Sequence, residues 1–232
     1  MTLMGVITKD ITFSFKDSSR PGYLVLPDGN GPFPGIIVIH EAFGLNENIR
    51  DVARRFAGEG YATLAVDLFS GRSRVICMFN YLTATLVGKL DHSGINELKA
   101  ALTFLGEQEN VGAQRLGAIG FCLGGGLAIA WAFSDQRLHV IAPFYGINPR
   151  NTQELAARSC PVVGSYPGND FTAGMGRALQ TALERAEIPN DIKVYPGASH
   201  SFFNDQLARS YNAEAAADAW ERTLSFFKQC LK

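Results

Sequence analysis

Short apolar runs alternate along the chain with stretches in which apolar positions recur at helical spacing. The apolar runs have the length of buried strands and lie at residues 35–40, 62–68, 115–119, 139–145, 161–165 and 192–195. The helical patterns lie at residues 47–58, 93–107, 125–133, 173–186 and 213–229. Continuously apolar strands that alternate with helices are typical of a parallel sheet covered on both faces. The pattern predicts an α/β fold with a mostly parallel central sheet.

Two regions depart from this alternation. Residues 11–15 and 22–26 predict two opening strands around a polar turn, followed by a Gly/Pro loop at 27–34, and we expect an antiparallel edge there. Residues 69–89 are the least regular part, with only a weak helical pattern at 78–87. We interpret the stretch 69–89 as a small insertion over the functional site.

Length and composition limit the classes of protein to consider. A chain of 232 residues with 47% hydrophobic and 19% charged residues suits one globular domain, which we expect to span residues 1–232. The net charge of −1 and the absence of a Lys/Arg run give no electrostatic reason to expect nucleic acid or a membrane as partner. We expect a small-molecule substrate and a monomer or small homo-oligomer.

The distribution of cysteines and apolar residues bears on location. Residues 1–10 lack the basic and apolar regions of a signal peptide, and no later segment is apolar over the length of a membrane span. The four cysteines contain no C-x-x-C pair. We therefore expect a cytoplasmic protein with reduced thiols, no metal and no organic cofactor.

One cysteine stands in a sequence context that indicates chemistry. Cys122 is the central residue of Gly120-Phe-Cys-Leu-Gly124, which follows the apolar run at 115–119 and precedes the small-residue helical pattern at 125–133. The pattern G-x-C-x-G corresponds to the nucleophile elbow G-x-S-x-G, in which the nucleophile sits on a strained turn between strand and helix. Sulfur here replaces oxygen.

Glycine-rich turns between strand and helix can also bind phosphate groups, but this sequence does not fit those motifs. The glycines do not follow the G-x-G-x-x-G order of a dinucleotide site, and no Lys-Ser or Lys-Thr pair follows as in a P-loop. A free cysteine can also be a small buried apolar residue, and that alternative stays open on the turn alone.

A thiol nucleophile needs a base, and the base needs an orienting partner. His200 is the best candidate because it lies on a loop just after the strand at 192–195. We interpret His92 as a surface residue and His139 as a core residue. His40 ends a strand beside Glu41.

Asp170 is the candidate acid. It follows the strand at 161–165 through a glycine-containing loop that can curl back toward the same sheet edge. Asp205 and Asp67 are weaker alternatives, and an ordinary turn aspartate is the competing interpretation of Asp170. Nucleophile, acid and histidine then follow the chain order of α/β-hydrolases, and each comes after the carboxyl end of a strand, where open sheets bind ligands.

Taken together, these segments resemble the dienelactone hydrolase family, the cysteine-using branch of the α/β-hydrolase superfamily. The resemblance extends over most of the chain. The segments that carry it are His40-Glu-Ala-Phe-Gly-Leu45, Asp67-Leu-Phe69, Gly120-Phe-Cys-Leu-Gly-Gly125, Gly168-Asn-Asp170 and His200-Ser-Phe202.

The resemblance implies roles for further residues. It implies that Glu41 contacts the resting cysteine, where a carboxylate would disfavour a permanent thiolate; a helix-capping or solvent-facing glutamate is the alternative. The backbone N–H groups of Leu123, which follows the nucleophile, and, by resemblance, of Ala42 would form the oxyanion hole. Candidate acyl-pocket residues, for which plain core packing is the alternative, are Phe43, Tyr145, Ser201 and Phe202.

One departure from the family concerns substrate charge. Family members that act on chlorocatechol-pathway lactones hold a substrate carboxylate with two arginines. After His200 this chain has no arginine until Arg209, and near the first position stand Arg72 and Arg74. We therefore expect hydrolysis of small carboxylic esters or lactones of the dienelactone type through a Cys-His-Asp triad and a thioester, with a specificity that is broader or shifted toward uncharged substrates. A broad esterase, thioesterase or acyltransferase on the same site, or a non-catalytic thiol sensor, are the alternatives.

Overall fold

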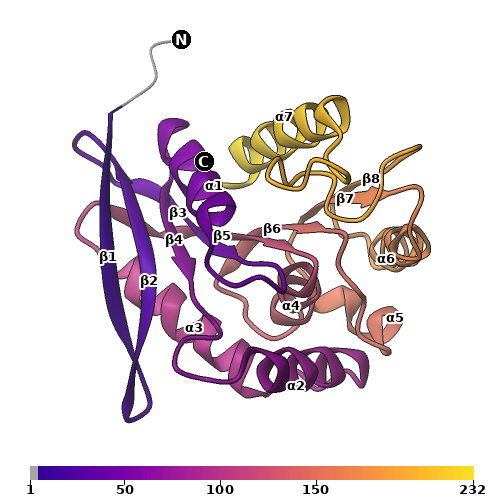
Figure 1. Ribbon diagram of the computed structural model, residues 1–232, viewed down its shortest axis with the longest axis horizontal. Coiled ribbons are helices and arrows are strands. Elements are labelled where there is room, and N and C mark those ends of the chain that lie inside the picture. The colour runs from indigo at the N-terminus through magenta and orange to yellow at the C-terminus, as the bar shows by residue number, and fades with distance from the viewer. Residues whose placement is uncertain (1–4) are drawn as a thin grey trace.

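A twisted sheet forms the centre of the computed structural model, which describes residues 5–232 (Figure 1). Residues 1–4, part of the segment from which no signal peptide was expected, lie outside the described residues. Within 5–232 the sheet has eight strands in the order β1-β2-β4-β3-β5-β6-β7-β8. These strands are β1 (Val6–Phe15), β2 (Ser18–Pro27), β3 (Phe33–Ile39), β4 (Ala62–Val66), β5 (Val111–Phe121), β6 (Leu138–Phe144), β7 (Val162–Pro167) and β8 (Asn190–Tyr195).

The sheet is parallel from β4 to β8 and antiparallel at its first edge. β1 pairs antiparallel with β2, and β2 pairs antiparallel with β4, whereas every later pairing is parallel. This confirms the predicted α/β fold class. The carboxyl ends of β3, β5, β6, β7 and β8 consequently meet at one edge of the sheet.

Helices cover both faces of the sheet. In the view of Figure 1, α1 and α7 lie above it and the remaining helices below it. Their bounds are α1 (Glu47–Gly58), α2 (Arg74–Leu86), α3 (Ser93–Gly106), α4 (Leu123–Ala132), α5 (Thr152–Leu155), α6 (Thr172–Arg185) and α7 (Ala213–Cys230), with a 3₁₀ turn, η1, at Ala156–Arg158.

The alternating side chains of the strands divide the core into two clusters. In β3, Ile36 and Val38 pack with α1 and α7, whereas Ile37 and Ile39 pack with α3 and α4. Successive side chains of a strand point to opposite faces, so a strand that is buried on both faces must be continuously apolar. This explains why the parallel strands were recognisable as apolar runs.

Two regions differ from the sequence-based expectations. Residues 74–86 form a regular helix, whereas the sequence predicted only a weak helical pattern at 78–87. The pattern is weak because many apolar residues of α2 face outward. The short helix α5 and the turn η1 were not predicted. Glu97 of α3 is fully buried and connects α3 to β2 and to the segment just before α2. Its carboxylate accepts two hydrogen bonds of 2.7 Å from Arg72 and one of 3.2 Å from Arg20.

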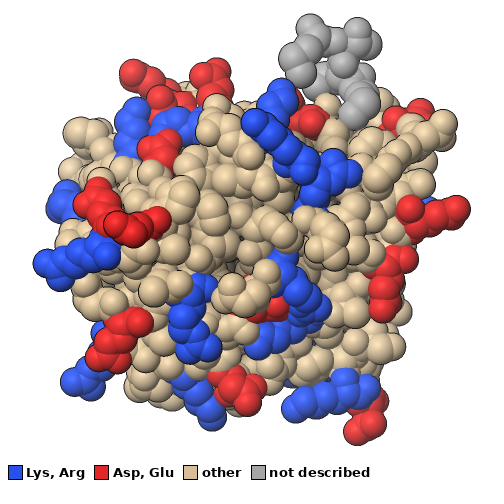
Figure 2. All heavy atoms as spheres, turned by 180° about the vertical axis from the view of Figure 1, so that it is seen from behind, with Lys and Arg blue, Asp and Glu red and all other residues tan. Residues whose placement is uncertain are grey.

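The charged residues show no concentration of one sign on the face drawn in Figure 2, where Lys and Arg are interspersed with Asp and Glu. Among the helices that the structure describes, none combines the length and the apolar character needed to cross a bilayer.

Candidate active site

Cys122 lies on a sharp turn at the carboxyl end of β5. Its φ of 53° and ψ of −110° are unfavourable for a residue with a side chain, and its backbone N–H donates to the carbonyl of Phe144 over 3.0 Å. α4 begins at the next residue, Leu123. The backbone is therefore the strand-to-helix elbow that G-x-C-x-G predicts.

The two glycines of this pattern are required by close backbone contacts. A Cβ on Gly120 would collide with the carbonyl group of Gly124, and a Cβ on Gly124 would collide with the carbonyl oxygen of Ile39. The absence of side chains at both positions lets α4 approach β5 and β3 directly.

The Cys122 thiol lies in an environment that keeps it protonated at rest. Burial, and then the negative charge of Glu41, raise its pKa to about 11. The backbone N–H groups of Leu123 and Ala42 face the sulfur and offset part of this increase. These are the two groups expected to form an oxyanion hole.

His200 and Asp170 approach each other from two different loops. Nδ1 of His200 lies 3.2 Å from Oδ2 of Asp170, at ion-pair distance but outside good hydrogen-bond alignment. The other oxygen of Asp170 accepts from the backbone N–H of Thr172 over 2.8 Å and from its hydroxyl over 2.5 Å. Burial alone would raise the pKa of Asp170, but the bonds from Thr172 and the nearby His200 lower it below its ordinary value. Asp170 therefore forms an Asx turn with one oxygen and faces the imidazole with the other.

Glu41 is buried and has partners for both carboxylate oxygens. Tyr145 donates its hydroxyl to Oε1 over 3.0 Å, and Asn204 donates its side-chain amide to Oε2 over 3.0 Å. Burial and the Glu41 carboxylate raise the pKa of the Tyr145 phenol well above its ordinary value, so the phenol stays a donor. The carboxylate is thus held in place beside the thiol, whose pKa it raises.

Backbone strain is concentrated around this constellation. Cys122, Tyr145 and Ser201 all adopt positive φ, at 53°, 41° and 62°. Each such conformation costs about 1–3 kcal/mol and persists only where the surrounding structure enforces it. All three residues follow the carboxyl end of a strand, the edge at which the sequence placed the candidate chemistry.

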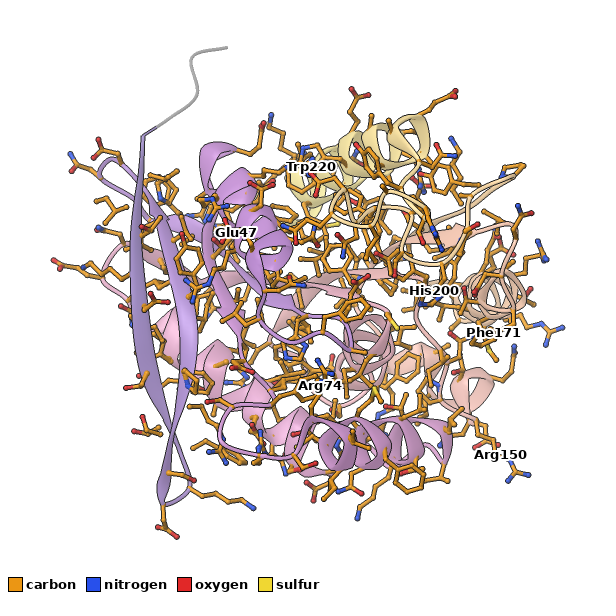
Figure 3. The ribbon with its side chains drawn as sticks, in the orientation of Figure 1. Glu47, Arg74, Arg150, Phe171, His200 and Trp220 are labelled. Atoms are coloured by element: carbon orange, nitrogen blue, oxygen red, sulfur yellow. The ribbon has the colours of Figure 1, made fainter. Side chains whose placement is uncertain are left out.

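A cavity of about 240 Å³ opens beside the thiol. Its walls are largely apolar and are formed by Ala42, Met78, Leu82, Cys122, Leu123, Tyr145, Ile147, Phe171, Thr172 and His200. Figure 3 shows His200 and Phe171 close together beside α6. The Phe171 side chain is mostly exposed and forms part of the rim.

The four residues proposed from sequence as pocket lining lie in different places. Tyr145 lines the cavity, but Phe43, Ser201 and Phe202 do not. Phe202 is fully buried against Phe144 and Tyr195, with ring centroids 6.3 and 5.1 Å away, and Phe43 is half exposed. Ser201, between them, adopts a positive φ of 62°, and this turn points Phe202 into the core while His200 faces the cavity.

The remaining histidines and acids have other partners. His40 is buried, with Nδ1 2.6 Å from the carbonyl of Glu41 and Nε2 accepting from the N–H of Leu68, and its burial lowers its pKa. Asp67 lies 4.0 Å from His40, and Asp205 accepts from Asn48. His92 precedes α3, and His139 is at the amino end of β6, the opposite end from Cys122.

Neither arginine near the first family position extends into the cavity. Arg72 is bound to Glu97 and also donates to the carbonyl of Leu68. Arg74 is exposed at the start of α2 (Figure 3) and does not line the cavity. Shortly after His200, the neutral Asn204 donates its side-chain amide to Glu41.

Several residues of the site were not identified from the sequence. Met78 and Leu82 come from α2, whose helical pattern is weak, and Ile147 and Phe171 come from loops with no periodicity. Thr172 alone had a local signal, since a hydroxyl two residues after an aspartate often completes an Asx turn. Among residues 5–232, no three His, Cys, Asp or Glu side chains gather as metal ligands would.

The comparisons with known proteins agree on one family. The family model described as "Dienelactone hydrolase family" matches residues 21–231. Two relatives are named "Putative carboxymethylenebutenolidase". The one from Saccharolobus solfataricus is 31% identical to this chain, and the one from Methylorubrum extorquens is 33% identical. The matches cover 97% of this chain in each case, and 99% and 82% of the relatives. A Klebsiella pneumoniae crystal structure named "Putative Dienelactone Hydrolase" superposes with a TM-score of 0.84 at 28% identity, covering 97% of this chain and 99% of the other.

Proposed function

This chain belongs to the dienelactone hydrolase family, and on that premise we propose that Cys122 attacks the carbonyl carbon of a small carboxylic ester or lactone. The family makes the chain a dienelactone hydrolase-like hydrolase. One observation carries the assignment of residues: a strained thiol, an imidazole and two inward-facing N–H groups border the same cavity.

In the first half of the proposed reaction, His200 takes the thiol proton as the sulfur forms a bond to the carbonyl carbon. The negative charge on the carbonyl oxygen is stabilised by the N–H groups of Leu123 and Ala42. The tetrahedral intermediate then expels the alkoxide, which receives the proton from His200. A thioester on Cys122 and a free alcohol result; in a lactone, the alcohol remains attached to the acyl group.

In the second half, His200 takes a proton from water, and the resulting hydroxide attacks the thioester carbon. The sulfur leaves as a thiolate and recovers its proton from His200, which releases the carboxylic acid. Asp170 orients the imidazole through Nδ1 and stabilises its protonated form, a role supported by the 3.2 Å separation.

Glu41 acts before substrate arrives. Burial is the main reason that the thiol stays neutral, and the negative charge of Glu41 beside the sulfur adds to it, which protects the thiol from oxidation and alkylation. Because Tyr145 and Asn204 hold both oxygens, the carboxylate keeps this position in the resting protein.

The proposed substrates are uncharged near the scissile bond. A bidentate arginine is the group suited to a substrate carboxylate, and Arg72 is already engaged by Glu97. After His200 the chain has no arginine until Arg209, and the neutral Asn204 in that stretch is turned toward Glu41. A carboxylate that entered the largely apolar cavity would lose its hydration without gaining an ionic partner.

The experiment compares Cys122→Ala with Cys230→Ala, which removes a thiol at the end of α7. Hydrolysis of p-nitrophenyl acetate should be lost in the first variant and kept in the second. Mass spectrometry of a rapidly quenched reaction should show Cys122 heavier by the mass of the acyl group, which is the direct sign of the thioester intermediate. Turnover by Cys122→Ala close to that of the wild type would disprove the assignment.

A further inference from the structure

A second cavity is lined by three of the chain segments that also line the one at Cys122. It measures about 420 Å³ and is lined by Leu86, Asn148, Pro149, Arg150, Thr152, Gln153, Met175 and Ala178. The two cavities follow one another along three separate segments of chain. Leu82 and Leu86 are one turn apart on α2, Ile147 and Asn148 are consecutive, and Thr172 lies one turn before Met175 on α6. We call the two cavities together the α2–α6 trough.

The loop beneath the second cavity is attached to both helical walls. The backbone N–H of Arg150 donates to the carbonyl of Leu86 at the end of α2 over 3.2 Å. On the other side, the Asn148 side-chain amide donates to the carbonyl of Met175 over 2.7 Å. These bonds hold the two walls at a set separation, so the trough is a feature of the folded scaffold.

The lining of the α2–α6 trough is suited to an uncharged chain. Among the described residues that line either cavity, Arg150 is the only Lys, Arg, Asp or Glu, and its side chain extends away from the body of the protein in Figure 3. The second cavity also contains aliphatic surface from Leu86, Met175 and Ala178.

The outward face of α2 has the same character. Val75, Phe79, Leu82 and Leu86 recur at a spacing of three or four residues and are all exposed. Leu82 and Leu86, the last two members of this stripe, form the α2 wall of the trough. Exposed apolar residues that border a catalytic cavity often mark a ligand-binding groove.

We propose that the α2–α6 trough is an extended substrate subsite for a linear, uncharged hydrocarbon chain attached to the scissile ester. This inference rests on the proposed function of Cys122. From Leu82 to Leu86 the trough advances about 6 Å at 1.5 Å per residue, room for about five methylene groups beyond the first cavity. The preferred substrates are therefore medium-chain esters.

Chain-length profiles test the proposal. One series varies the acyl group of p-nitrophenyl esters from acetate to decanoate, and a second varies the alcohol of alkyl acetates, both below the concentration at which micelles form. In one of the two series kcat/KM should rise about two- to fourfold per methylene until the trough is filled, as expected for partial burial of each CH₂. The series that responds identifies which side of the ester occupies the trough, and flat profiles in both would overturn the proposal.

Ala178→Glu places a carboxylate at the distal wall, on an exposed position of α6. For the responding series, the ratio of kcat/KM for the eight-carbon ester to that for the two-carbon ester should fall about fivefold or more. Arg177→Glu, the neighbouring exposed position that does not line the trough, is the matched control and should keep the ratio within about twofold. Leu86→Ser, on the opposite wall, should repeat the fall.

The two proposals fail in different ways. If acetate esters are hydrolysed with a Cys122 thioester but Ala178→Glu and Leu86→Ser leave the ratio unchanged, the subsite is wrong and the proposed function stands. If no ester of any length forms the thioester, the proposed function itself is wrong.

Discussion

Glu41→Gln should make the resting thiol more reactive. The substitution removes the negative charge that helps raise the pKa of Cys122 to about 11, while leaving the shape of the side chain unchanged. A glutamine in the same place can accept from Asn204 with its oxygen and donate to the Tyr145 hydroxyl with its nitrogen, so both contacts can be kept. The perturbation is therefore almost purely electrostatic.

The size of the effect follows from two opposing factors. If the pKa falls by about one unit, the thiolate fraction at pH 7.5 rises about tenfold. A less basic thiolate is also less nucleophilic, with a Brønsted slope of about 0.4–0.5, which lowers its intrinsic rate constant about threefold. The observed rate constant for alkylation at Cys122 should consequently rise about three- to fourfold per unit of pKa.

The assay is pseudo-first-order inactivation by iodoacetamide between pH 7 and 10, with mass spectrometry to separate Cys122 from the other three cysteines. In the wild type the rate should rise tenfold per pH unit and show no plateau below pH 10, because the pKa is about 11. Glu109→Gln, which removes an exposed charge, is the control and should match the wild type. A Glu41→Gln rate equal to or below that of the wild type would refute the electrostatic account.

Four further substitutions have expected outcomes. Asp170→Asn should lower kcat about a thousandfold or more, because asparagine can hold the imidazole in the wrong tautomer. The turn at Thr172 should be kept. Steady-state kinetics measure the loss of activity, and thermal melting measures any loss of stability. Gly124→Ala should destabilise the protein by about 1–3 kcal/mol, since its Cβ meets the backbone of β3. Gly174→Ala, at an exposed position with open space around it, should be neutral or should stabilise the protein by up to about 1 kcal/mol. Urea unfolding of both variants checks this contrast. Glu97→Gln should lower the free energy of unfolding by about 3–5 kcal/mol, because it leaves Arg72 without its charge partner. A urea unfolding midpoint within error of that of the wild type would contradict this.

The fold and the approximate position of the site were predictable because both depend on simple periodicities. Parallel strands buried on both faces must be apolar throughout, so their order along the chain identified the sheet and the loops after its carboxyl ends. Cys122, Asp170 and His200 each follow such an end, and the structure brings Asp170 to His200 and places Cys122 and His200 on one cavity. Their catalytic roles stay predictions that the kinetics above would test.

The side-chain surroundings could not be predicted in the same way. Whether Phe202 enters the core or the cavity depends on the left-handed turn at Ser201, which no periodicity records. The partners of Arg72 and Asn204 are distant in sequence, 25 residues away for Glu97 and 163 residues away for Glu41. Such contacts follow from the packing of elements, and α2 in particular was only weakly indicated because its apolar residues face outward.

The state of the resting thiol has a consequence for the oxyanion hole. The N–H groups of Leu123, at the positive end of α4, and of Ala42, in the loop after β3, would favour a thiolate. Burial and Glu41 outweigh them and keep the sulfur protonated. A neutral thiol is a weak acceptor, so these N–H groups lose little when they turn from the sulfur to a substrate oxygen. A permanent thiolate would instead compete with the oxyanion for the same donors. On the proposed mechanism, Glu41 therefore preserves the donors for the charge that develops during the reaction.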